Sequence, residues 1–157
     1  MRFSERFKIA ALTESADVTT AGVDSYSVHM GKMHEGCWLL NFGAITSDDA
    51  LKVYVGASQG TKTTAIAFKY RHAAADTKSA LSDTFGAFTD VASAGLTLTA
   101  ATFDHKLLIV EIDSQAIADA TPYVTLEIAG SASAQNISIV FIGRPRFASN
   151  SGTPSVL

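Results

Sequence analysis

The residues best suited to chemistry gather in one short stretch of the chain. The segment "SVHMGKMHEGCWLL", from Ser27 to Leu40, contains two histidines and the only cysteine. Imidazole and thiolate are common zinc ligands and a thiolate is also a nucleophile, so His29, His34 and Cys37 are the first candidates for a metal or catalytic site. Their spacing, His29-x4-His34-x2-Cys37, matches no metal signature, and no CxxC or HxH pair accompanies it.

Packing explains Cys37 more simply than chemistry does. Trp38, Leu40 and Phe42 alternate with Leu39 and Asn41, which places Cys37 at the threshold of a strand as a small buried hydrophobic residue. A nucleophile would need a neighbouring base and an oxyanion hole, and the sequence points to neither. We therefore expect no catalytic residue, no metal site and no cofactor, with an enzyme centred on Cys37 kept as an alternative.

The elements that must position these residues are predicted to be strands. Apolar and polar residues alternate in "LKVYVGA", "TTAIAFKYRH", "GLTLTAA", "KLLIVEID", "YVTLEIAG" and "NISIVFIG", and period-two alternation is typical of strands that bury one face. We predict that "TTAIAFKYRH" forms a single strand. Its buried face would carry Ile66, Phe68, Tyr70 and His72.

Eight or nine such strands, without a long amphipathic helix between them, predict an all-β fold with little helix. We expect an antiparallel β-sandwich, jelly-roll-like in its connections. It would form a single domain over residues 1–147 with an N-terminal arm at residues 1–8, followed by a flexible C-terminal tail at residues 148–157.

Composition limits the classes of partner. The chain of 157 residues has 47% hydrophobic and 17% charged residues and a net charge of -3, so no broad basic surface is expected and nucleic acid is an unsuitable partner. The longest apolar run, "LLIV", is far shorter than the roughly 20 residues of a membrane helix. One cysteine and a start without an apolar leader indicate synthesis in a cytoplasm. No small-molecule substrate is expected.

Basic and aromatic residues mark the two ends of the chain. Five of the twelve lysines and arginines lie there, and basic ends on an acidic body indicate a partner surface that is itself acidic. We expect the partner contacts to include Arg2, Phe3, Arg6, Lys8, Arg144, Arg146 and Phe147. Small outward residues around Ala65, Ala67, Thr97 and Thr99 predict a second, flat surface for self-association.

The order of the segments resembles a family of small virion structural proteins of tailed bacteriophages, the head decoration or cement proteins. The likeness lies in "FKIAAL", "ADVTTAGVDSYSVHMGKMHEGCWLLNFGAI", "LKVYVGASQGTKTTAIAFKYR", "LLIVEIDSQAI" and "PYVTLEIAGSASAQNISIVFIGRPRF", which cover most of the chain from Phe7 to Phe147. These are patterns of strand and turn, and the family provides no functional residues to carry over.

The resemblance implies a non-enzymatic protein that binds and stabilises the head shell. Its partners would be the major capsid protein and itself, as a homotrimer, and it would reside on the outer capsid surface after synthesis in the host bacterial cytoplasm. Two alternatives stay open. One is a tail, baseplate or fibre position in the virion, and the other is a carbohydrate-binding jelly roll, which would present exposed Trp and Tyr on one sheet face.

Overall fold

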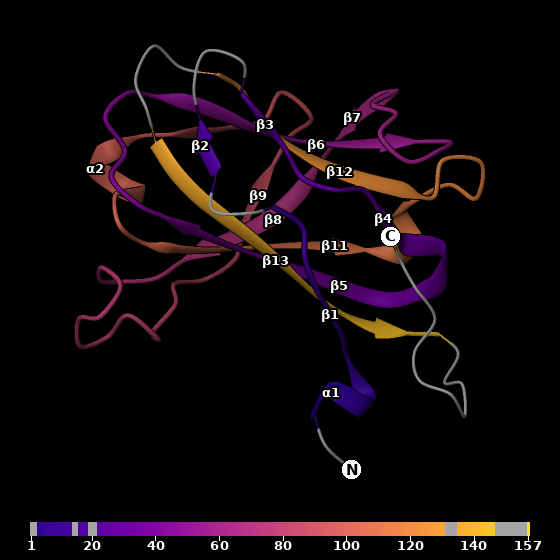
Figure 1. Ribbon diagram of the computed structural model, residues 1–157, viewed down its shortest axis with the longest axis horizontal. Helices are drawn as coiled ribbons and strands as arrows, with labels where there is room; N and C mark the ends of the chain where they lie inside the picture. Colours follow the sequence, from indigo (N-terminus) through magenta and orange to yellow (C-terminus); the bar gives the residue numbers. More distant parts are fainter. Residues whose placement is uncertain (1–2, 14–15, 19–21, 131–134, 147–156) are drawn as a thin grey trace.

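Two antiparallel β-sheets packed face to face form the body of the protein (Figure 1). The computed structural model describes residues 3–13, 16–18, 22–130, 135–146 and 157. Within these residues the chain forms thirteen strands and four short helical turns. The expected all-β sandwich is therefore confirmed. The strand number exceeds the predicted eight or nine, since several strands have only two or three residues.

Sheet A has seven strands. In spatial order they are β1 (Lys8–Ala11), β13 (Gln135–Pro145), β5 (Met33–Phe42), β11 (Leu107–Asp113), β8 (Phe68–His72) and β9 (Thr89–Val91), with β2 (Ala16–Val18) also paired to β13.

Sheet B has six strands and lies above sheet A in the view of Figure 1. The main order is β10 (Leu96–Leu98), β6 (Asp49–Gly56), β12 (Tyr123–Ile128) and β3 (Val23–Asp24), with β4 (Val28–His29) beside β12 and β7 (Thr64–Ile66) beside β6. The helical turns are α1 (Phe3–Arg6), η1 (Met30–Lys32), α2 (Ala100–Phe103) and η2 (Ser114–Ala116).

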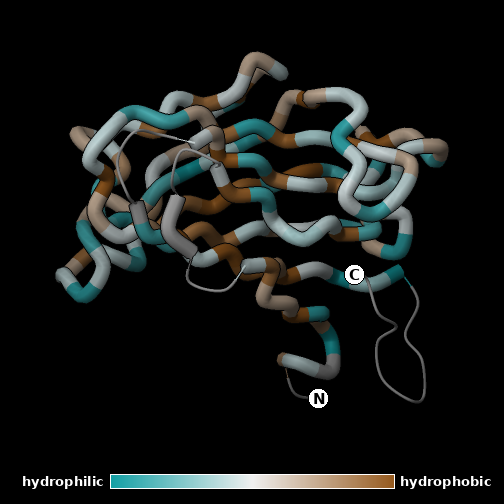
Figure 2. Tube along the Cα trace, turned by 45° about the horizontal axis from the view of Figure 1, so that its top comes forward, coloured by the Kyte–Doolittle hydropathy of each residue, from teal (hydrophilic) through white to brown (hydrophobic). Residues whose placement is uncertain are grey.

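The core lies between the sheets and contains the residues that the alternating patterns predicted to face inward. Trp38 is fully buried near its centre, and its ring centroid lies 4.9 Å from that of Phe141. Along the strands, hydrophobic positions alternate with polar ones, and the loops are more hydrophilic (Figure 2). Fully buried aliphatic side chains complete the core, including Leu40, Leu51, Val53, Leu98, Leu108, Val110, Val124, Leu126, Ile128, Ile137 and Ile139.

Strand β5 organises sheet A because it pairs with both long neighbours along most of its length. Trp38 lies opposite Phe141 on β13 and opposite Val110 on β11. One cross-strand pair consists of two glycines, Gly36 and Gly143. A Cβ atom at either position would come within 2.6 Å of the Phe141 ring. The Phe141 ring therefore packs against the backbone of these two glycines, which have no side chains.

The predicted single strand "TTAIAFKYRH" is two strands, which corrects the sequence interpretation. β7 pairs with β6 in sheet B, whereas β8 pairs with β11 in sheet A, and the chain crosses between the layers at Ala67. Ile66 and Phe68 both contact the core from opposite layers. Because the side chains alternate correctly through the crossing, the period-two pattern does not reveal it.

Polar groups occupy the outer face of sheet B. The Lys62 ammonium group forms ion pairs with Asp24, at 2.8 Å, and with Glu127, and it lies 5.8 Å from the centre of the Tyr54 ring. Burial alone would lower the pKa of Lys62, but hydrogen bonds to the two carboxylates outweigh that effect and raise it. The solvent-facing side of sheet B therefore has charged residues that form ion pairs with one another.

Candidate interaction face on sheet A

The outer face of sheet A differs from that of sheet B because much of it is apolar. Two rows of side chains cross the strands in register. The first, here called the apolar row, consists of Ala11, Val140, Leu39, Ile109 and Arg71. The second, here called the mixed row, consists of Ile9, Ile142, Cys37, Glu111, Lys69 and Asp90.

Strands β5 and β13 have apolar residues on both faces, so some of their apolar side chains point away from the core. Leu39, Val140 and Ile142 are half-buried, while Ile9 is 47% exposed on the edge strand β1. An antiparallel sheet commonly presents a polar face to water, and a contiguous apolar patch usually marks a surface that binds another molecule. We therefore identify the part of the sheet formed by β1, β13 and β5 as the candidate interaction face.

The opposite part of this outer face is already covered by the chain itself. The Arg71 guanidinium lies 5.3 Å from the ring centre of Phe85 and 4.6 Å from that of Phe88, both in the long connection between β8 and β9. Ile109, next to Arg71 in the apolar row, is only 7% exposed. Among the described residues, the partly exposed apolar side chains of this face therefore lie on the side of the sheet where the N-terminal arm enters.

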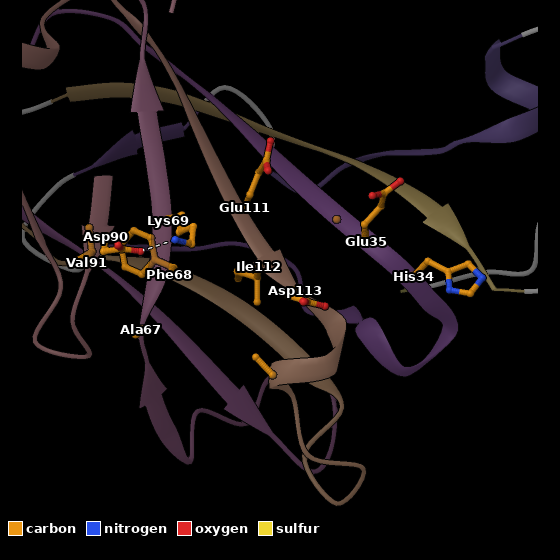
Figure 3. A pocket seen from close by; sticks show the side chains of 12 residues that line it. His34, Glu35, Ala67, Phe68, Lys69, Asp90, Val91, Glu111, Ile112 and Asp113 are labelled. Atoms are coloured by element: carbon orange, nitrogen blue, oxygen red, sulfur yellow. Dashed lines mark ion pairs between the residues drawn. The ribbon is translucent and has the colours of Figure 1, made fainter. Parts of the chain in front are cut away.

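A groove follows the mixed row at one end of the sheet. It consists of two hollows of about 470 and 190 Å³ that share Glu35, Gly36 and Glu111 as lining residues. Cys37 and Ile142 line the smaller hollow. The Glu35 and Glu111 side chains rise from the neighbouring strands β5 and β11, and Lys69 is paired with Asp90 at 2.7 Å (Figure 3). Both hollows therefore combine apolar side chains with the shared Glu35 and Glu111 carboxylates.

Cys37 belongs to this groove and not to the core. It lies within β5 and faces outward between Ile142 and Glu111, so the expected position at the strand threshold was wrong. Two successive exposed residues, His34 and Glu35, interrupt the alternation before Gly36. The alternation in the sequence therefore does not indicate that the strand begins at Met33. Burial, reinforced by the nearby Glu111 carboxylate, raises the pKa of the Cys37 thiol to about 11. The thiol is protonated at neutral pH, which is unfavourable for a nucleophile.

The N-terminal residues predicted to contact a partner lie beside the same groove. Phe3 is 56% exposed, and its ring stacks on Phe7 with centroids 4.6 Å apart. Phe7 lines the smaller hollow, whereas Arg6 is exposed on α1. Lys8 is already part of β1, opposite Gly143, so the predicted arm at residues 1–8 includes one turn of helix and the start of the sheet. Arg2 lies outside the described residues.

The two C-terminal arginines have different roles. Arg144 is exposed, and its guanidinium lies 3.9 Å from the Glu35 carboxylate at the rim of the smaller hollow. Arg146 instead donates from Nε to the Met33 carbonyl oxygen at 2.8 Å, and its backbone N–H donates to Lys32. Arg146 thus fastens the start of β5. Phe147 and all of the predicted tail except Leu157 lie outside the described residues.

The three residues first considered as metal ligands do not form a cluster. His29 lies on β4 in sheet B, where its ring packs against Tyr123, while His34 and Cys37 lie on β5 in sheet A. Within the described residues, no three His, Cys, Asp or Glu side chains are grouped to hold a metal ion. No helix in the described part of the chain is long and apolar enough to cross a membrane.

Sequence reasoning missed the interaction face, although a signal was present. The runs "WLL", "LLIV" and "IVFI" contain apolar residues at successive positions, which is typical of strands with both faces apolar. No protein-family model, curated protein or solved structure matches this chain. Its function must therefore be inferred from its own residues and surfaces.

Proposed function

We propose that the protein is a non-enzymatic virion structural protein that decorates and stabilises the head shell of a tailed phage. In this proposal the partners are the major capsid protein and further copies of the chain, as a homotrimer on the outer capsid surface. The segments of strand and turn that resemble decoration proteins support the class of protein. The observation that carries the proposal is the group of partly exposed apolar side chains, Ile9, Ile142, Val140 and Leu39, on the outer face of sheet A.

This face suits attachment better than catalysis. Protein interfaces are enriched in apolar and aromatic residues at their centre and surrounded by a polar rim. Here Leu39, Val140 and Ile142 would form the centre, with Glu35 and Arg144 at the rim. A stable complex buries roughly 1,200 to 2,000 Å² in total, which a sandwich face together with its arm can provide.

A pelleting assay with empty expanded heads tests the proposal. Leu39→Glu places a charge in the centre of the face, so we expect attachment to weaken by about tenfold or more. Ser93→Glu is the matched control, because Ser93 is exposed in the turn between β9 and β10, outside this face. Circular dichroism and melting curves verify that both variants fold. Equal attachment of both variants, or no attachment of the wild-type protein, would contradict the proposal.

The same assay can also test the contribution of the rim residue Arg144. Arg144→Glu should weaken attachment more at low salt than at high salt, because salt screens exposed charges. Arg146 is unsuitable for this substitution, since it holds the Met33 carbonyl group within the fold.

A further inference from the structure

We infer that the N-terminal segment of one copy docks in the groove along the mixed row of a second copy. The segment consists of residues 3–8, "FSERFK", and the groove consists of the two hollows that share Glu35, Gly36 and Glu111. The inference deepens the proposed function, because it assigns the surfaces through which copies associate.

The helical part of the segment, α1, extends away from its own sandwich in both views (Figures 1 and 2). The Phe3 ring stacks on Phe7 yet stays more than half exposed. A helix of one turn has little stability by itself, and exposed aromatic side chains on it gain free energy when a neighbouring surface covers them.

The groove has apolar side chains that could cover the exposed Phe3 ring. Its smaller hollow, about 190 Å³ beside Cys37 and Ile142, stays open although Phe7 of the same chain already lines it. A second copy's Phe3 would find apolar side chains there. Because Lys8 is held opposite Gly143 and Phe7 lines the hollow of its own copy, Phe3, which stacks on Phe7 and stays exposed, is the part of the segment available to contact a second copy.

Charge complements this apolar fit. The lining includes four carboxylates, Glu35, Asp90, Glu111 and Asp113, against the two basic residues Lys69 and Arg144. Lys69 pairs with Asp90 and Arg144 with Glu35, which leaves an excess of two carboxylates, Glu111 and Asp113. Residues 3–8 contain two basic residues, Arg6 and Lys8, and one acidic residue, Glu5. Arg6 lies on the same helical turn as Phe3, so its guanidinium would approach the Glu111 carboxylate when Phe3 enters the smaller hollow that Glu111 also lines.

Because the segment and the groove are different surfaces, the contact can repeat around a closed ring or be made twice across a two-fold axis, and sedimentation distinguishes a trimer from a dimer. A ring of three is the arrangement that the resemblance implies. The chain needs no other partner for it, so association should occur in the free protein.

Analytical ultracentrifugation of the full-length protein, without heads, tests the inference. The wild-type protein should be oligomeric at high micromolar concentration, while Phe3→Ala and Glu111→Lys should each weaken association by about tenfold or more. Leu81→Ala is the control, because Leu81 is 62% exposed on a loop outside the groove and should leave association unchanged. The charge-swapped double variant Arg6→Glu with Glu111→Lys should regain association.

A monomeric wild-type protein would overturn the inference, as would an oligomer that Phe3→Ala and Glu111→Lys leave intact. Head attachment is measured separately. Oligomers that fail to bind heads contradict the proposed function and leave the docking inference standing.

Discussion

At the scale of single residues, the surroundings of Cys37 determine whether its thiol can react. Cys37 has the residue type of a nucleophile, but it is half-buried between Ile142 and Glu111 on the outer face of sheet A. Both burial and the carboxylate disfavour the thiolate. The same position makes the thiol part of an apolar surface. At this scale, residue type was read correctly from the sequence, whereas the direction of the side chain required the register of three strands.

The first prediction concerns the reactivity of this thiol. Alkylation of Cys37 should be slow at neutral pH and accelerate toward about pH 11, because the thiolate is the reactive form. Iodoacetamide labelling followed by mass spectrometry over a pH series measures the profile. Cys37→Ala provides the unlabelled control. Labelling at neutral pH as fast as that of a small free thiol would show that the thiolate is stabilised.

The second prediction concerns His29. Burial, and next the Lys32 ammonium group, lower the pKa of its imidazole, so the folded state binds a proton less readily than the unfolded state. The free energy of unfolding should therefore fall as pH decreases below about 6.5. His29→Phe keeps an aromatic ring against Tyr123 and removes the titration, so it should flatten this dependence. Urea unfolding at several pH values measures both proteins, and identical slopes would contradict the assignment.

At the scale of elements, alternation in the sequence predicts most strands and their inward faces. It does so because one buried face imposes a period of two, as in β6, β12 and β13. It fails at Ala67, where the chain changes sheets without changing its alternation, and before Gly36, where exposed residues interrupt the start of β5. The two rows of the interaction face could not be predicted, because each consists of residues from five or six strands whose register comes from the assembled sheet.

The two faces of β5 provide the third prediction. Leu40→Ala should lower the free energy of unfolding by about 2 to 5 kcal/mol, because Leu40 is fully buried and its truncation leaves a cavity. Leu39→Ala, one residue earlier on the outer face, should cost about 1 kcal/mol or less. Denaturant unfolding measures both variants. Comparable losses would mean that the outer face is covered in the free protein.

The N-terminal segment provides the fourth prediction. Deleting the first six residues should leave the sandwich folded, because the ladder between β1 and β13 begins at Lys8. The same deletion should weaken attachment to heads, since it removes Phe3 and Arg6, which lie on α1 next to the interaction face. Melting curves and the pelleting assay report the two effects independently. A truncated protein that decorates heads as well as the full chain would place the contacts elsewhere.

The whole molecule combines a polar outer face on one sheet with an apolar outer face on the other. Lys62 and its two carboxylate partners stabilise sheet B toward water. Sheet A instead has Leu39, Val140 and Ile142 facing outward, beside an acidic groove and a basic aromatic arm. Such an asymmetric sandwich suits a protein that lies on a larger assembly with one face bound and the other in solvent.

The central claim is that this protein attaches to a phage head through the outer face of sheet A. Electron microscopy of heads incubated with the protein, or of phage particles in which it is detected, tests this claim most directly, because the map gives copy number, position and orientation together. We predict sandwich-shaped density on the outside of the head, in a copy number close to that of the major capsid protein. Sheet A should face the shell or a neighbouring copy, with sheet B toward solvent. A few copies at the tail, or head-bound copies with sheet A open to solvent, would contradict the claim.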